Sequence, residues 1–267
     1  MSIVRSGEDL RFDPAPTRRT IIRGAMGAGL LAAGFAPHNG AMADELPAGG
    51  PGGLGERTAA EFWAGEPRLY TRADWDARPP KRPAEVLNRA PDHIIVHHTA
   101  TANSKDRSLS HAFALSRKIQ RWHMDGNGWD DAGQQLTISR GGIVMEGRNR
   151  SLDSIRAGNL AVGAQVLHHN DHTIGIENEG TYSTKGVPKR LWTSLVEVCV
   201  WLCEQYRLDP NEAIAGHRDF NNTSCPGDRL YRRLPDLRRE VAARLDGVPK
   251  GGAHPETSIF PPFDPFG

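Results

Sequence analysis

Cysteine and long apolar stretches are both scarce in this sequence. The 267 residues include 3 Cys, too few for a disulfide framework, and the mean hydropathy is −0.52. Hydrophobic residues make up 38% of the chain and aromatic residues 7%. That is enough apolar material for the core of a folded domain and too little for a bundle of membrane-spanning helices. The composition therefore indicates a globular protein and argues against an integral membrane protein.

A marked excess of charge of either sign is also missing. The chain has 33 Lys+Arg and 32 Asp+Glu, for a formal net charge of +1 at pH 7. Domains that bind nucleic acid usually carry a clear basic excess on one face. We therefore expect no nucleic-acid partner.

The first 43 residues have the three parts of an export signal. Arginines at positions 18, 19 and 23 precede an uncharged stretch at 24–37, and Ala41-Met42-Ala43 forms a small-residue cleavage motif. The uncharged stretch is shorter than the roughly 20 residues that a membrane-spanning helix needs, so we expect no stable membrane insertion after signal removal. Arg18-Arg19 resembles the twin-arginine signal of bacterial proteins exported already folded, with a general secretory signal as the alternative. Either signal predicts a secreted or cell-envelope protein.

The remaining chain reads as one domain between two margins. Residues 44–68 and 248–267 are rich in Gly and Pro and lack apolar periodicity, so we expect a linker and a tail around a domain at 69–247. Strand-length apolar runs occur at 93–96, 136–139, 143–146, 173–176 and 213–215, and helical patterns at 108–124, 188–206 and 228–245. The order β, α, β, β, β, α, β, α predicts an α/β domain in which helices flank a mixed central β-sheet. We expect a monomer.

The helix predicted at 188–206 carries two of the three cysteines. Its apolar positions recur at helical spacing, at Leu191, Leu195, Val198, Cys199, Leu202, Cys203 and Tyr206. Cys199 and Cys203 lie one helical turn apart, where a disulfide is geometrically awkward. We expect both to be buried thiols that behave as small hydrophobic side chains.

Three other segments carry side chains suited to a metal. One predicted strand ends in the pair His97-His98, a second is followed by Gly216-His217, and Cys225 stands before the turn-forming Pro226-Gly227. Two imidazoles and one thiolate suit Zn²⁺, and three protein ligands leave a fourth position for water, as in catalytic zinc sites. The alternative is that these side chains are structural, because with 11 His in the chain some must stand beside such neighbours by chance.

Four blocks of sequence together resemble a known family. They are Thr71-Arg72-Ala73-Asp74-Trp75-Asp76-Ala77-Arg78; Val96-His97-His98-Thr99-Ala100-Thr101; the stretch from Gly128-Trp129-Asp130-Asp131-Ala132-Gly133 to Glu146-Gly147-Arg148; and Gly216-His217-Arg218-Asp219 with Cys225-Pro226-Gly227. In this order they are similar to the N-acetylmuramoyl-L-alanine amidase family, which also includes phage lysozyme-type amidases and peptidoglycan recognition proteins. The resemblance covers about residues 69–245.

This resemblance implies a role for each of five residues. It assigns zinc to His97, His217 and Cys225. Glu177 looks like the general-base carboxylate of the cytoplasmic muropeptide amidases, and Thr223 matches a position that holds the substrate carbonyl. On the residues alone, Thr223 is equally well an ordinary turn threonine.

One position departs from the family pattern. Phage and animal members have a Tyr where this chain has Gln134, and an amide cannot donate a proton as a phenol does. The cytoplasmic amidases also lack this Tyr and rely on the carboxylate that Glu177 would supply. Glu179 points to the same face two residues further along the predicted strand and is the nearest alternative base.

The resemblance therefore implies zinc-dependent hydrolysis of the amide bond between N-acetylmuramic acid and L-alanine. Peptidoglycan or its muropeptides would be the substrate, and no organic cofactor is implied. Two alternatives stay open. The first is a recognition module that binds peptidoglycan without cutting it. The second is a zinc hydrolase of another amide, because a fold and a ligand set do not fix a substrate.

Overall fold

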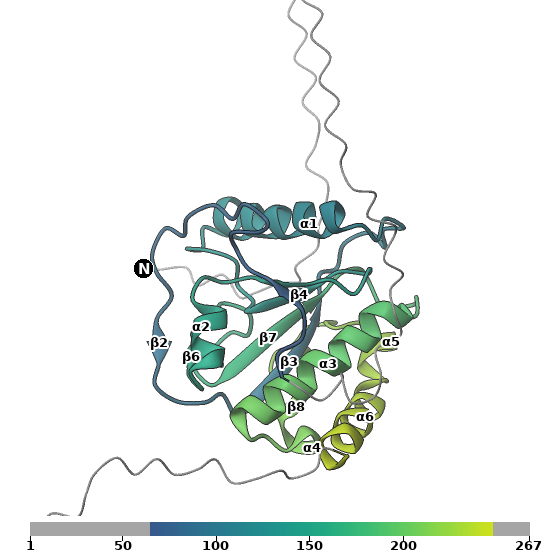
Figure 1. The fold of residues 1–267 in the computed structure, drawn as a ribbon. Coiled ribbons are helices and arrows are strands. Elements are labelled where there is room, and N and C mark those ends of the chain that lie inside the picture. Colours follow the sequence, from purple (N-terminus) through teal and green to yellow (C-terminus); the bar gives the residue numbers. More distant parts are fainter. Residues whose placement is uncertain (1–64, 248–267) are drawn as a thin grey trace, which may run out of the picture.

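A mixed six-stranded sheet forms the centre of the molecule in a computed structural model, which describes residues 65–247 (Figure 1). The strand order is β1-β5-β4-β7-β3-β8; β4 and β5 are antiparallel, and every other neighbouring pair in this sheet is parallel. The strands are β1 (Leu69–Tyr70), β3 (His93–His98), β4 (Leu136–Ile138), β5 (Val144–Glu146), β7 (Thr173–Asn178) and β8 (Ile214–Gly216). A separate antiparallel pair joins β2 (Val86–Leu87) to β6 (Leu160–Ala161).

Helices cover both faces of the sheet. Figure 1 shows α1 (Leu109–Arg121) along one side, and α3 (Lys189–Tyr206) with α6 (Leu234–Asp246) on the other. Four shorter helical segments and one π-helical turn complete the fold: η2 (Trp122–Gly126), α2 (Ser151–Arg156), α4 (Pro210–Ala213), η3 (His217–Asp219) and α5 (Asp228–Tyr231). The predicted α/β fold with a mixed central sheet flanked by helices is confirmed.

The main core lies between the sheet and α3. All seven positions of the predicted apolar stripe on this helix are buried, and Cys199 and Cys203 are free thiols with 0% and 2% of their surface exposed. Pro188 stands at the helix N-cap, where its missing N–H costs no hydrogen bond. Burial in this apolar layer raises the pKa of Cys203 to about 12, so both cysteines are core side chains as predicted.

The helix expected at 228–245 is in fact two helices. The first, α5, ends at Tyr231, and α6 begins at Leu234 with Pro235 in its first turn. Proline has no N–H to donate to Tyr231, and its ring would clash with the carbonyl four residues back. Pro235 therefore ends the continuous helix, and the prediction of one helix over 228–245 was wrong at this point.

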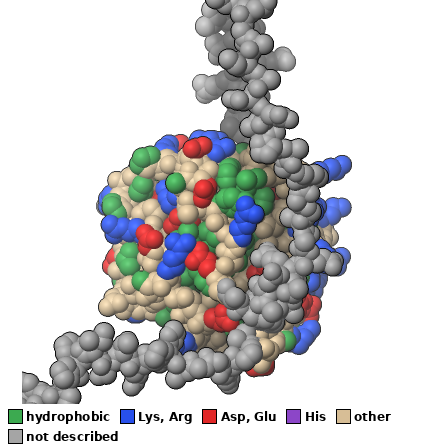
Figure 2. All heavy atoms as spheres, viewed as in Figure 1, with side chains coloured by type: hydrophobic (Ala, Val, Ile, Leu, Met, Phe, Trp, Pro, Cys, Tyr) green, Lys and Arg blue, Asp and Glu red, His purple; other side chains and the backbone are tan. Residues whose placement is uncertain are grey.

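The predicted signal segment and tail lie outside the described residues, as does most of the predicted linker. Within the described part, Glu66 already pairs with Arg156 of α2 at 2.7 Å, so ordered contacts begin just before β1. No helix between residues 65 and 247 is long and apolar enough to span a membrane. The face in Figure 2 carries basic and acidic side chains mixed together.

Candidate metal centre

Three adjacent parallel strands bring the predicted site residues together. In the sheet β3 lies between β7 and β8, and all three strands run in the same direction. His97 lies near the end of β3 and pairs in register with Glu177 of β7, while His217 directly follows β8. These residues therefore gather at the carboxyl ends of the strands, where α/β sheets commonly bind ligands.

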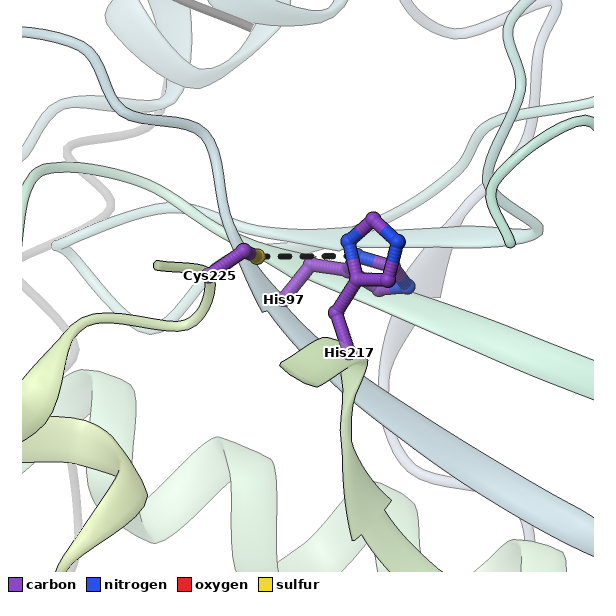
Figure 3. Close-up of side chains that lie close together, drawn as sticks. All are labelled: His97, His217 and Cys225. Atoms are coloured by element: carbon purple, nitrogen blue, oxygen red, sulfur yellow. Dashed lines mark hydrogen bonds between the residues drawn. The ribbon is translucent and has the colours of Figure 1, made fainter. Parts of the chain in front are cut away.

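The three predicted metal ligands form one cluster. Ligand atoms of His97, His217 and Cys225 all lie within 4.8 Å of one another, and the two imidazole centroids are 4.6 Å apart. Figure 3 shows the thiol facing the His97 ring, with the Cys225 Sγ to His97 Nδ1 distance at 3.7 Å. Cys225 reaches this position through a turn in which the Gly227 amide donates to the Ser224 carbonyl, and Gly227 has a φ of +85° that favours glycine.

Two amide side chains contact the Nε2 atoms of His97 and His217 and determine their tautomers. Gln165 Oε1 lies 2.6 Å from His97 Nε2, and Asn221 Oδ1 lies 3.1 Å from His217 Nε2. A carbonyl oxygen only accepts, so each Nε2 carries the proton and each Nδ1 keeps a lone pair. Such outer contacts fix the tautomer and orientation of metal-binding histidines in known metal centres. Sequence reasoning missed Gln165 and Asn221.

Burial keeps the side chains of His97 and Cys225 uncharged when no cation is bound. Desolvation, aided by repulsion from His217, holds the pKa of His97 well below its usual value, so its imidazole is neutral. Burial, with the charge of Glu177, raises the pKa of the Cys225 thiol well above its usual value. A divalent cation would repay the cost of deprotonating this thiol, as metal binding does at cysteine sites generally. The donor set therefore fits zinc.

Glu177 is a buried carboxylate with a free oxygen. Its Oε2 has no hydrogen-bond partner among residues 65–247, and desolvation raises the pKa of the carboxyl group to about 8. Buried polar atoms are nearly always paired, so an orphaned carboxylate oxygen beside a metal-type cluster points to a missing partner. Glu179, the alternative base, is already engaged: its oxygens lie 2.6 Å from His111 Nε2 and 2.7 Å from the Arg140 amide.

Thr223 and Gln134 hold positions that limit their chemistry. Thr223 Oγ1 accepts from the Cys225 amide at 3.2 Å, the contact of a turn threonine, which leaves its hydroxyl proton free to donate. Gln134 is 1% exposed and donates from Nε2 to Thr137 Oγ1 at 2.8 Å. Thr137 of β4 is the register partner of Glu177 on β7, so Gln134 contacts the strand next to that of Glu177. Its own Oε1 has no partner among the described residues.

The acidic block at 130–131 is structural. Asp131 is fully buried, and its carboxylate accepts from Arg72, from Gln120 and from both the amide and the side chain of Asn149. The Trp75 indole beside Arg72 donates to the Glu146 carbonyl at 3.0 Å. These bonds fasten the segment before β2 to the central hairpin and place no group at the metal cluster.

Comparison with known proteins agrees with this geometry. A family model described as N-acetylmuramoyl-L-alanine amidase matches residues 87–228. A human N-acetylmuramoyl-L-alanine amidase is 31% identical over 176 residues, which cover 65% of this chain and 29% of the human protein. Peptidoglycan-recognition protein LB of Drosophila melanogaster is 29% identical over 167 residues, or 62% of this chain and 67% of that protein.

Solved structures show the same relation. Wild-type Drosophila PGRP-LB superposes with a TM-score of 0.55 at 28% identity, covering 62% of this chain and 92% of that one. A mutant of the same protein has been solved in complex with tracheal cytotoxin, and it matches with a TM-score of 0.54 at 28% identity. The family match spans more than half of the sequence and includes both segments that bring His97 and Cys225 together. The chain therefore belongs to the N-acetylmuramoyl-L-alanine amidase family, whose relatives include the peptidoglycan-recognition proteins.

Proposed function

We propose that this protein is a zinc-dependent amidase that cuts the bond between N-acetylmuramic acid and L-alanine in peptidoglycan. The observation that carries the proposal is the cluster of His97, His217 and Cys225 beside Glu177, a buried carboxylate with one oxygen unpaired. A pure recognition module has no need of a desolvated base next to three metal-type ligands. A hydrolase needs both.

His97, His217 and Cys225 would hold the ion through two Nδ1 atoms and the sulfur. When bound, zinc polarises an amide carbonyl and lowers the pKa of a water molecule at its open position. Gln165 and Asn221 keep the two imidazoles in the tautomer and orientation that this binding requires.

Glu177 would move the proton. Its unpaired Oε2 accepts a proton from the attacking water and returns it to the leaving amine nitrogen of L-alanine. Without a metal its pKa is about 8. A cation close by favours the ionised form and brings the carboxylate into the range of a base at neutral pH. Thr223 Oγ1 donates its free hydroxyl proton to the developing oxyanion.

The substrate class comes from the relatives. The matched human protein is named for this amide hydrolysis, and the matched PGRP-LB structure holds tracheal cytotoxin. This chain spans about 29% of the human protein's length, so the substrate is part of the proposal.

A binding-only role is the second candidate, and Gln134 is what favours it. The phenol that accompanies zinc in phage and animal members is replaced here by a buried amide that donates to Thr137. On this reading the chain would bind muropeptides and release no product. A third outcome is hydrolysis of a different amide.

One digestion separates these outcomes. Purified peptidoglycan is incubated with the protein, with the protein plus chelator, and with chelated protein reloaded with zinc. The expected products are glycan strands and stem peptides with new L-alanine amino termini, identified by mass, absent with chelator and restored by zinc. Binding without new amino termini would show a recognition module, and a different new end would show another specificity.

A further inference from the structure

A second group of metal-type side chains lies near the other ends of the same strands. Asp92 and His93 stand at the start of β3, and His172 directly precedes β7. Asp92 Oδ1 lies 2.6 Å from His93 Nδ1 and 2.8 Å from His172 Nδ1. The Asp92 amide donates to the His172 carbonyl at 2.9 Å, which holds the two strand starts in register. The donor atoms of all three residues fall within 4.8 Å of one another.

A fourth residue, His169, is placed to stabilise the tautomer of His172 that metal binding would require. His169 Nδ1 lies 3.0 Å from His172 Nε2. If His172 Nδ1 binds a cation, its proton moves to Nε2 and is donated to His169, so both nitrogens of His172 have a partner. Metal-binding histidines typically donate their other N–H in this way. The backbone at His169 is held in place, because its carbonyl accepts from Thr173 Oγ1 at 2.7 Å.

The surroundings give the cluster one apolar wall and one open side. The Phe220 ring packs against His93 at 5.2 Å and against His169 at 5.0 Å between centroids. The side chains of His93 and His172 are 34% and 30% exposed, and that of Asp92 is 61% exposed. An ion could enter from solvent while the ring shields the imidazoles from one side.

We propose that Asp92, His93 and His172 bind a second divalent transition-metal cation, with His169 orienting His172. Two imidazoles and one carboxylate are ligands that zinc and its first-row neighbours accept, and the remaining coordination positions face solvent. This cluster shares no residue with the His97, His217 and Cys225 centre, and the proposal does not depend on amidase activity.

The second ion would brace the segment that supports the first centre. His172 ends a loop in which Asn170 Oδ1 accepts from the amide of Gln165 at 2.7 Å, and Gln165 contacts His97. On the other side Phe220 precedes Asn221, whose Oδ1 accepts from the Leu167 amide at 3.0 Å and lies beside His217. Filling the second cluster therefore ties down both amides that orient the first pair of histidines.

Cobalt titration of the metal-free protein, without an affinity tag, tests the proposal. Cobalt bound at Cys225 gives an intense sulfur-to-metal charge-transfer band, whereas a site of two imidazoles and a carboxylate gives only weak visible bands. We expect one equivalent of cobalt to bind with the intense band, at Cys225, and a second equivalent to bind without it. In His172→Asn and His93→Asn proteins the second equivalent should weaken by at least about tenfold, while the charge-transfer band is kept.

His168→Asn is the matched control. His168 is exposed in the same loop and has a φ of +69°, a conformation that Asn tolerates, so this variant should bind both equivalents like the parent. The Cys225→Ala protein should lose the intense band and keep the second equivalent, which separates the two centres. A single equivalent in the parent, or a second one unaffected by both His93→Asn and His172→Asn, would overturn the proposal.

Discussion

Cys225 is the residue whose replacement most sharply tests the proposed metal centre of His97, His217 and Cys225. Its sulfur is the one cysteine sulfur near His97, because the two other cysteines of the chain lie on α3 and face the core. Replacing Cys225 with Ala leaves two imidazoles, which hold zinc far more weakly than a three-ligand set. We expect the Cys225→Ala protein to retain one equivalent of zinc less than the parent after dialysis, as measured by elemental analysis.

Cys203→Ala is the matched control for this loss. It also removes a buried thiol, at a cost of about 1 kcal/mol for the small cavity, and it should keep the parent's zinc content. Parental zinc affinity in Cys225→Ala would show that the ligand assignment is wrong.

The sequence indicated the three candidate metal ligands but not Gln165 and Asn221, which orient the two histidines. Both histidines of the proposed metal site stand at strand ends, and a motif next to a strand can be recognised from a short stretch of chain. Gln165 is 68 residues from His97 along the chain, in a loop with no motif of its own. Glutamine has many structural uses, so only the folded geometry shows that its carbonyl faces His97 Nε2.

The strand β7 makes room for that glutamine. A Cβ on Gly175 would lie 2.7 Å from both Cδ and Oε1 of Gln165, closer than real Cβ contacts allow. Gly175→Ala should therefore push the amide away from His97 and weaken zinc binding about 10- to 100-fold, as loss of an outer-shell partner typically does. Chelator competition at the thiolate-containing centre measures this effect.

Gln165→Ala should reproduce the defect, and the double variant should be little worse than either single one, because both remove the same contact. Gly186→Ala is the control, since nothing lies within 4 Å of a Cβ there. Unchanged zinc affinity in Gly175→Ala would mean that Gln165 does not support the centre.

The π-helical turn η2 makes the fold sensitive to acid through His123. Burial lowers the pKa of His123 from its usual value of 6.5 to about 4, and its Nδ1 accepts from the Gly133 amide at 3.0 Å. The unfolded chain takes up a proton below pH 6.5 and the folded chain does not until about pH 4. The stability contributed by neutral His123 is therefore present above pH 6.5 and lost as the pH falls toward 4, by up to about 3 kcal/mol.

Thermal unfolding of the metal-free protein at pH 7 and pH 5 measures this contribution of His123 to stability. The His123→Asn protein can keep an acceptor for the Gly133 amide but has no group that titrates there. It should lose less stability than the parent between the two pH values, with the other buried histidines supplying the remaining slope. Equal losses in both proteins would contradict this role for His123.

Among the elements, length decided what could be predicted. The long apolar stripe of α3 has a clear helical period and β3 contains a continuous apolar run, and both elements were placed within a few residues. The strands β1, β2 and β6 have two residues each, too short for any period, and they form only because partners far along the chain pair with them. Pro235 lies in the first turn of α6 and indicates the break between α5 and α6, which a prediction from apolar spacing alone misses.

For the whole molecule, the remaining proposal concerns export. Arg18 and Arg19 lie outside the described residues, and we propose that they direct the folded protein out of the cytoplasm by the twin-arginine route. Folding first would let Cys225 take up zinc in a reducing compartment, before an unmetallated thiol meets oxidising conditions. A fusion of residues 1–43 to a reporter that is active only when exported folded should give signal outside the cytoplasm.

Changing Arg18 and Arg19 together to Lys should block export of this fusion and leave its synthesis unchanged. Export of the double-Lys fusion at the parental level would instead indicate the general secretory route.

In the proposed mechanism the fold holds a metal through His97, His217 and Cys225 and places Glu177 beside it as the base. The most direct test is the kcat of the zinc-loaded Glu177→Gln protein on a muramoyl peptide, beside the parent and a Gln134→Ala control. Gln keeps the size of Glu and removes its basic oxygen. We expect parental zinc content in Glu177→Gln with kcat lower by about two to four orders of magnitude, and a far smaller loss in Gln134→Ala. Near-parental turnover by Glu177→Gln, or a larger loss in Gln134→Ala, would contradict it.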